Sequence, residues 1–277
     1  EPPRDPRRAR EATGGAMEAP IDDPAELRRR CREGTFTGPT TGHCRGRLQA
    51  NMVILPRSHA LHFLLYCQRN PKACPLLEVL EDGQVECTAL ARGSDVRTDL
   101  PAYRVFVDGE QTHEAADVTS VFPPDAWTFL LGCSFTFEDA LLQAGVPVRH
   151  LPDRNVPMYI TNQPTRSAGP FSGPLVVSLR CMPPAFVALA VEISARFPCT
   201  HGAPVHVGDP SALGVDLSAP DFGDPPRMEE GDVPVFWACG VTPQVALAQA
   251  RPPLCITHSP GCMMVLDEAY EGLRRGS

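Results

Sequence analysis

The feature that most constrains the fold is a pattern that recurs from residue 172 onward. A β-rich apolar run is followed by a short turn and then by proline in the first turn of a predicted helix. The pattern occurs in "PLVVSLRCMPPAFVALAVEISARF", "PVHVGDPSAL" and "VPVFWACGVTPQVALAQAR", and "PLCITHS" adds one more apolar run. Strands that alternate with helices are typical of a parallel sheet covered on both faces. The sequence therefore predicts an α/β fold with a mixed, mostly parallel sheet.

The sequence pattern changes between residues 79 and 171. "YRVFVDGEQTHEA" predicts a hairpin whose turn is Asp108–Gly109. "DAWTFLLGCSFTFEDALLQAG" predicts two helical pieces that are broken at Gly132, the second of them capped by Thr136. We expect this stretch to form a compact α+β unit.

Three segments follow from these patterns. Residues 1–23 begin with a polar, proline-rich and aperiodic run and are predicted to be a disordered N-terminal segment. Residues 24–78 and 172–277 are predicted to form the main α/β domain, and residues 79–171 a smaller α+β domain inserted into it.

Composition excludes several classes of protein. The net charge of -8 and the lack of a basic stripe argue against a nucleic-acid or anionic-membrane binder. The 11 cysteines are odd in number and contain no CxxC pair, which favours buried thiols in a reducing, intracellular compartment. No apolar run approaches the ~20 residues of a membrane span. The arginine-rich start points to the mitochondrial matrix, but its acidic residues and prolines keep the cytoplasm open.

The run "CTHGAPVHVGDP" raises the question of a site. Gly208, Asp209 and Pro210 are explained as a strand-to-helix turn, with Asp209 as the N-cap. That interpretation leaves His201 and His206 unexplained. In open α/β sheets, ligands bind beyond the carboxyl ends of the strands. We therefore expect His206 to share a cleft with the polar residues that end or follow other strands: Arg180, Gly240, Thr242 and His258.

Motifs narrow the chemistry further. There is no GxGxxG or P-loop, so no nucleotide cofactor is expected, and there is no GxSxG nucleophile turn. Cys133 and Ser134 are read as a small-residue break, after which the free N–H groups of a helix start suit a carboxylate. The same holds for the helix that Thr242 is expected to cap.

The histidines and arginines leave more than one interpretation open. His201, His206, Asp209 and His258 have the chemistry of metal ligands, but their spacing matches no known ligand motif, so structural histidines are favoured. Arg180 and Asn162 border extended segments and could recognise a dicarboxylate, because guanidinium pairs with carboxylate through two hydrogen bonds. Arg104 is interpreted as a partner in a surface ion pair.

These residues also carry a family resemblance. The segments "QANMVILPRSHALHFLLYCQRNPKACPLLEV", "FLLGCSFTFEDALLQAGVPVRH", "RNVPMYITN", "HGAPVHVGDPSALG", "PVFWACGVTPQ" and "ITHSPGCMMVLD" resemble, in order and over about residues 35–267, a hydro-lyase family formerly of unknown function. The same module is similar to the N-terminal half of mitochondrial D-glutamate cyclase. The resemblance implies a three-layer sandwich and a smaller two-layer unit, and lyase chemistry in which D-glutamate loses water to give 5-oxo-D-proline.

The catalytic and binding roles are predicted from the residues themselves and not from the resemblance. His206 is predicted to be the base or acid, with Asp209 and His201 assisting. The predicted substrate-binding residues are Arg180, Cys133, Ser134, Asn162, Gly240, Thr242 and His258. No cofactor is expected, although the resemblance leaves a divalent metal open. The expected partner is a small carboxylate, and a homo-oligomer stays open. The alternatives are a non-catalytic ligand-binding module and a metal-dependent hydrolase.

Overall fold

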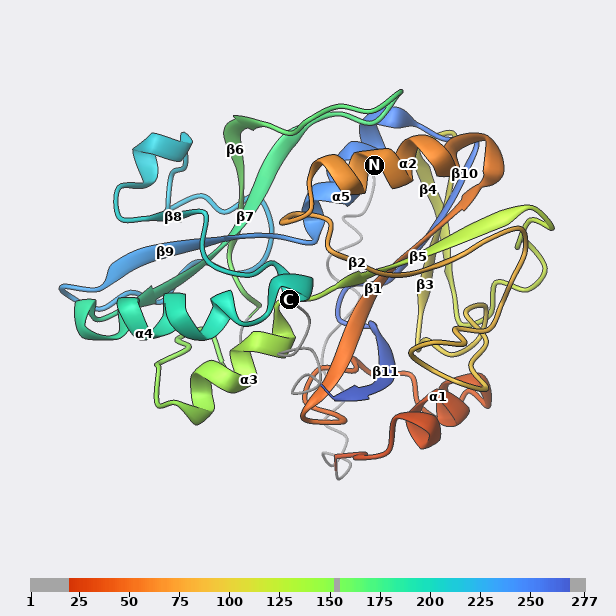
Figure 1. The fold of residues 1–277 in the computed structure, drawn as a ribbon, viewed down its shortest axis with the longest axis horizontal. Coiled ribbons are helices and arrows are strands. Elements are labelled where there is room, and N and C mark those ends of the chain that lie inside the picture. Colours follow the sequence, from red (N-terminus) through yellow and green to blue (C-terminus); the bar gives the residue numbers. More distant parts are fainter. Residues whose placement is uncertain (1–19, 152–154, 270–277) are drawn as a thin grey trace, which may run out of the picture.

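The computed structural model describes residues 20–151 and 155–269. Within these residues the strands form two sheets (Figure 1). The larger sheet has the order β2-β5-β1-β10-β3-β4, with β11 also paired to β1. Its strands are β1 (Arg47–Pro56), β2 (Leu76–Leu80), β3 (Tyr103–Val107), β4 (Glu110–Ala115), β5 (Ala126–Gly132), β10 (Leu254–His258) and β11 (Met264–Ala269). The smaller sheet has the order β6-β7-β9-β8, formed by β6 (Met158–Pro164), β7 (Pro174–Met182), β8 (His206–Val207) and β9 (Val233–Ala238).

The helices cover both sides of the strands. The α-helices are α1 (Pro24–Arg32), α2 (Arg57–Arg69), α3 (Phe135–Gln143), α4 (Pro184–Ala195) and α5 (Val241–Ala250), and the short 3₁₀ turns are η2 (Pro198–Thr200) and η3 (Pro210–Leu213). Figure 1 shows α2 and α5 on one side of the strands and α3 and α4 on the other. No helix in the described ranges has the length and apolar character that crossing a membrane requires.

The prediction of a mostly parallel sheet is wrong, since every strand pairing in the described residues is antiparallel. The reason lies in where the helices lead. The chain leaves β5 of the larger sheet, passes through α3 and enters β6 of the smaller sheet, and α5 takes it back from β9 to β10. A helix that connects two different sheets imposes no parallel pairing within either of them. Helices α2 and α4 do return to the same sheet, but an antiparallel strand, β5 or β9, lies between the two strands that each of them connects.

The larger sheet also runs across the expected domain boundaries. Strands β3, β4 and β5 come from the stretch 79–171 that was expected to form an inserted unit, yet they pair with β1, β2 and β10. The predicted N-terminal segment 1–23 lies mostly outside the described residues. At its end, Asp23 caps α1 by accepting a hydrogen bond from the Ala25 backbone N–H at 3.0 Å.

The local predictions have mixed outcomes. The hairpin is confirmed, since Asp108 and Gly109 at its tip have φ values of 49° and 83°, as a tight two-residue turn requires. The helical piece predicted before Gly132 is instead strand β5, which is buried along its whole length. The helix after it begins at Phe135, with Ser134 rather than Thr136 at the N-cap.

Two apolar cores hold the larger sheet between its covering layers. One core packs α2 and α5 on the sheet, and its centre is Phe63, whose ring centroid lies 4.9 Å from that of Phe129 and 5.2 Å from that of Phe171. The other core packs α3 and α4 between the two sheets and includes Trp237 of β9 and Met52 of β1. The second core therefore joins the two sheets into one body.

We expect Phe63→Ala to lower the free energy of unfolding by about 3–5 kcal/mol, because a fully buried ring would be replaced by a cavity. Leu61→Ala on the same helix is the control, since Leu61 is 62% exposed and its loss should cost at most about 0.5 kcal/mol. Urea denaturation monitored by circular dichroism measures both. Equal losses in the two variants would contradict the position of this core.

Candidate active site

The two helices that cross between the sheets begin at the same place. Helix α3 follows the turn Gly132–Cys133–Ser134 at the end of β5, and α5 follows Cys239–Gly240 at the end of β9. Neither N-cap residue, Ser134 or Gly240, makes a side-chain capping hydrogen bond. The positive end of a helix dipole attracts anions, although the first N–H groups of these helices already bond to the thiols and carbonyl oxygens of Cys133 and Cys239. Two such helix starts therefore face one junction.

Asn51 of β1 links the two turns. Its Nδ2 donates a long hydrogen bond to the carbonyl oxygen of Gly132, at 3.5 Å. A Cβ atom on Gly240 would lie only 2.3 Å from the same nitrogen. Gly132 is equally constrained, since a Cβ there would lie 1.8 Å from the carbonyl oxygen of Cys199. Gly132 is thus required by the backbone that packs on it, and a side chain at Gly240 would displace the amide of Asn51.

His201 lies against the start of α5. The residue has a left-handed backbone, with φ of 80°, which turns its ring inward. Its Nδ1 lies 2.8 Å from the backbone oxygen of Lys72, and its Cε1 lies 3.9 Å from where a Cβ on Gly240 would be. Because a carbonyl oxygen only accepts, Nδ1 carries the proton and Nε2 keeps its lone pair.

The charge state of His201 follows from its burial. Burial lowers the pKa of His201 to about 4, and the charge of Arg180 lowers it further against the opposing hydrogen bond to Lys72. The imidazole is therefore neutral at pH 7, and its Nε2 can accept a proton.

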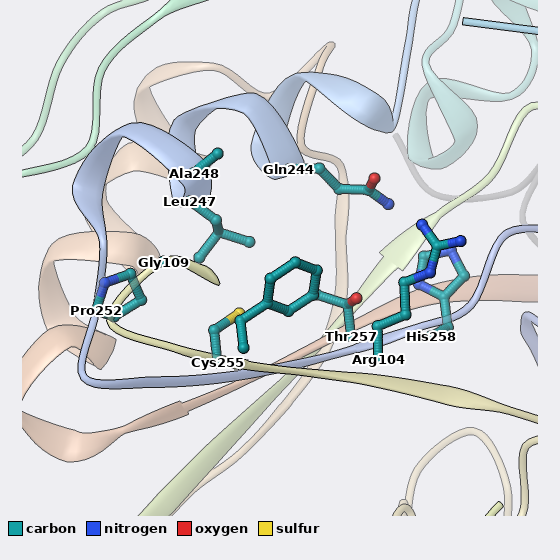
Figure 2. Close-up of a pocket in the computed structure, with 10 residues that line it drawn as sticks. Arg104, Gly109, Gln244, Leu247, Ala248, Pro252, Cys255, Thr257 and His258 are labelled. Carbon is teal, nitrogen blue, oxygen red and sulfur yellow. The ribbon is translucent and has the colours of Figure 1, made fainter. Parts of the chain in front are cut away.

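A pocket lies beside this junction, between α5 and the strands β3 and β10. Figure 2 shows its residues, which enclose about 450 Å³ of space open to solvent. One end is polar, with Arg104, Gln244, Thr257 and His258, and the other is apolar. The polar end lies near the junction, because His258 contacts Met52, the residue that follows Asn51 on β1.

His258 occupies the point where β1 changes partners. Strand β1 pairs with β11 from Arg47 to Ala50, and with β10 at Val53 and Ile54. Between these pairings, the backbone N–H of Met52 donates to Nδ1 of His258 at 3.1 Å. Nδ1 also lies 3.4 Å from the oxygen of Met52, but the shorter contact to nitrogen fixes Nδ1 as the acceptor. The proton of the neutral ring is then on Nε2, and His258 is a hydrogen-bond donor at the pocket.

Burial lowers the pKa of His258 to about 4, and the nearby Arg104 adds to this shift. Arg104 itself donates from Nε to Oε1 of Glu114 at 2.9 Å, the surface ion pair that the sequence predicted. Among the described residues no partner is seen for its Nη groups, and Figure 2 shows the guanidinium beside the ring of His258. Arg104 and His258 together therefore present donors to an anion.

Arg180 is buried on the other side of the junction. It donates to Ser178 at 2.8 Å, to Ser134 at 3.2 Å and to Glu138, and its guanidinium lies 5.2 Å from the ring centroid of Trp237. Most of its donors are thus taken, which makes it a positioning residue for the start of α3 rather than a free carboxylate binder.

Glu138 is the anion that balances Arg180. Burial alone would raise the pKa of Glu138, but the charge of Arg180 and the contact with His150 hold it below its ordinary value. The Nε2 of His150 lies 3.5 Å from Oε1 of Glu138. A buried carboxylate kept ionised in this way fixes Arg180 in place.

The structure places the remaining predicted residues elsewhere. His206 pairs with Phe236 on β9, with the rings 5.8 Å apart, and this face of the smaller sheet is opposite to the one that carries Val235, Trp237 and Arg180. Nε2 of His206 lies 2.7 Å from the backbone oxygen of Asp209, whose carboxylate caps η3, so both residues belong to one turn. No contact in the described part of the chain joins this turn to the junction.

Three further predicted binding residues have evident structural roles. Thr242 exchanges hydrogen bonds with the backbone of Val176 and ties α5 to β7. Asn162 is exposed and lies near Gly214. Burial raises the pKa of Cys133 to about 12, so its thiol is protonated at neutral pH. No three His, Cys, Asp or Glu side chains lie close enough to hold a metal ion within residues 20–151 and 155–269.

Sequence reasoning missed Asn51, Gln244 and Glu138. Asn51 gave a usable signal, since it interrupts the apolar run "LQANMVILP" and is only 8% exposed in the fold. An amide inside a strand that is otherwise buried requires a partner. Glu138 and Gln244 lie on helices where polar residues are common, and only the packing distinguishes them from polar residues that face solvent.

Comparison with known proteins identifies the family to which the chain belongs. The profile of the family described as D-glutamate cyclase matches residues 127–267. A protein named "Putative hydro-lyase" from Mycolicibacterium gilvum is 57% identical over 88% of this chain and 93% of its own length. Relatives with the same name from Stutzerimonas stutzeri and Rubrobacter xylanophilus are 56% identical over 90% and 88% of this chain, and 95% of their own lengths.

Among solved structures, a nitrogen repressor-like protein from Methanococcus jannaschii covers 90% of this chain and 99% of its own, with a TM-score of 0.36 and 11% identity. A likeness this distant carries no argument about the site.

The two buried histidines predict how stability depends on pH. Both have a folded-state pKa of about 4, below the ~6.5 of an unfolded chain, so only the unfolded state takes up protons between these values. The free energy of unfolding should be level above pH 7 and fall by about 2–3 kcal/mol per histidine toward pH 4.5. Urea titrations at stepped pH measure this, and His201→Gln should show a shallower fall. A level curve from pH 7 to 5 would contradict the burial of neutral rings.

Proposed function

This chain belongs to the D-glutamate cyclase family, and from that premise we propose that it is a hydro-lyase that closes D-glutamate into 5-oxo-D-proline and water. One observation supports this above the others. Arg104 and His258 offer hydrogen-bond donors to an anion in the pocket, and His258 is linked through Met52 and Asn51 of β1 to the Gly240 turn, against which the neutral imidazole of His201 packs.

The substrate has two carboxylates and an ammonium group, and the proposed site offers a partner for each. The α-carboxylate binds the Nη groups of Arg104 and the Nε2–H of His258, with the Gln244 amide at the same end of the pocket. The distal carboxylate lies at the junction, where the positive ends of the α3 and α5 helix dipoles meet. The ammonium group then lies near Nε2 of His201.

The reaction forms one C–N bond and breaks one C–O bond. His201 takes a proton from the ammonium group, and the freed amine attacks the distal carboxyl carbon. The positive ends of the α3 and α5 helix dipoles stabilise the oxyanion of the tetrahedral intermediate. The protonated His201 returns its proton to the departing oxygen, which also receives the second proton that the nitrogen loses. Water leaves, and the product keeps the α-carboxylate and one N–H.

The histidine tautomers fit these different roles. Nδ1 of His201 donates to the backbone oxygen of Lys72, which leaves the lone pair of Nε2 available as a base. Nδ1 of His258 accepts from the backbone N–H of Met52, which leaves its proton on Nε2 as a donor. Asn51 lies between the Gly132 and Gly240 turns and fixes their separation. The Arg180–Glu138 pair positions Ser134 at the start of α3. His206 and Asp209, the acid and base that the sequence favoured, have no part in this proposal because they lie on the opposite face of the smaller sheet.

We expect His201→Gln to lower kcat by about 10²–10⁴-fold, the range typical of a lost general base. His206→Ala is the matched control and should keep wild-type turnover. Formation of 5-oxoproline from D-glutamate, followed with and without a chelator, measures both. Full activity in His201→Gln, or a loss confined to His206→Ala, would remove His201 from the mechanism. Thermal stabilisation by D-glutamate without turnover would point instead to a ligand-binding module.

We expect Arg104→Gln to raise KM for D-glutamate by about 10–100-fold, because a charged hydrogen bond to a carboxylate is worth about 1.5–3 kcal/mol. Arg196→Gln is the control, since Arg196 also forms an exposed ion pair, with Glu192, but on α4. Initial rates over a range of D-glutamate concentrations distinguish the two variants. An unchanged KM in Arg104→Gln would exclude the pocket as the carboxylate site.

A further inference from the structure

We infer that the pocket between α5 and strands β3 and β10 also binds carboxylic acids that carry an apolar chain, in competition with the amino dicarboxylate. The inference rests on the proposed function for the placement of a carboxylate at Arg104. It goes further in assigning a ligand class to the half of the pocket that glutamate cannot use.

The two ends of the pocket differ in chemistry. Arg104 is the one charged side chain among the described residues that line it, and it lies with His258 at the polar end (Figure 2). At the other end the lining is Leu247, Ala248, Pro252, Phe106 and Cys255. Leu247 and Cys255 are only 5% and 3% exposed, so the walls of this end are formed by residues of the hydrophobic core.

The apolar end is closed by the β3–β4 hairpin. Gly109 lies at its tip, and a Cβ there would lie 2.6 Å from Cγ of Arg251. Arg251 packs its stem on the hairpin and donates to the backbone oxygen of Asp108 at 2.9 Å and to Glu110 at 3.3 Å. Its charge is therefore satisfied by the hairpin.

Glutamate leaves this end unfilled. A dicarboxylate held at Arg104 needs polar partners for its second carboxylate, and these lie at the polar end with Gln244 and Thr257, not toward Leu247 and Pro252. Placing a carboxylate in the apolar end would strip it of water without a compensating partner. An apolar chain has the complementary chemistry.

The dimensions fit a chain of moderate length. From Gln244 to Ala250 the pocket follows α5 for about 9 Å at the rise of a helix, and Pro252 just after it extends this wall further. An extended octanoate has a comparable length. Each methylene that enters should raise affinity about fourfold, as expected for burial of one CH₂ group.

The test is calorimetric binding of acetate, butyrate, hexanoate and octanoate to the full chain, with D-glutamate turnover measured in parallel. Ala248→Glu adds a negative charge at the apolar end, on an exposed helical position that tolerates it. Gln249→Glu adds the same charge to the next residue of α5, which is exposed and does not line the pocket. Arg104→Gln removes the carboxylate partner.

The inference predicts an affinity that rises about fifteenfold for every two methylenes in the wild type. This rise should be kept in Gln249→Glu and be at least tenfold weaker in Ala248→Glu, and all binding should fall in Arg104→Gln. Affinity that is independent of chain length overturns the inference.

The same experiment separates this inference from the proposed reaction. If D-glutamate is turned over with an Arg104-dependent KM but no acid of any length binds, the inference fails and the proposed function stands. If long acids bind through Arg104 and D-glutamate is not turned over, the pocket is confirmed as a site for apolar acids and the cyclase reaction fails.

Discussion

The contact between Asn51 and Gly240 is the constraint on which the arrangement of the site depends. Two chain segments that leave different sheets, at the ends of β5 and β9, come together over the side chain of one strand residue. A side chain at Gly240 would displace the amide of Asn51, and none fits at Gly132 where the backbone of Cys199 packs. This contact brings the starts of α3 and α5 to one junction.

The ion pair of Arg180 and Glu138 supports the junction from within. Arg180 projects from β7 of the smaller sheet, and Glu138 projects from α3, which follows the larger sheet. Removing both groups from water is costly, and their mutual attraction together with the Ser134, Ser178 and His150 contacts compensates for that cost. The pair therefore ties the two sheets together at the point where the start of α3 must be held.

The two histidines near the junction show how backbone groups can select function. His201 faces a carbonyl oxygen and His258 faces a backbone N–H, so burial leaves both neutral but with opposite tautomers. One ring can then accept a proton and the other can donate a hydrogen bond. The difference arises from the loop that carries Lys72 and from the change of partners along β1, and neither is visible in the residues around the histidines.

The sequence by itself determined the family, the hairpin at Asp108–Gly109 and the cap at Asp209, and it predicted His201, Gly240 and His258 as site residues, a prediction that the proposed function keeps. These follow from local chemistry: glycine tolerates a positive φ, aspartate caps a helix start, and polar residues that follow apolar strands lie near strand ends. Only the tertiary structure decided that the sheets are antiparallel, that His206 faces away from Arg180, and that Asn51, Arg104 and Gln244 line the site. The physical reason is that strand pairing and the face of a sheet depend on which sheet each helix leads to, and the alternation of strands and helices does not encode that destination.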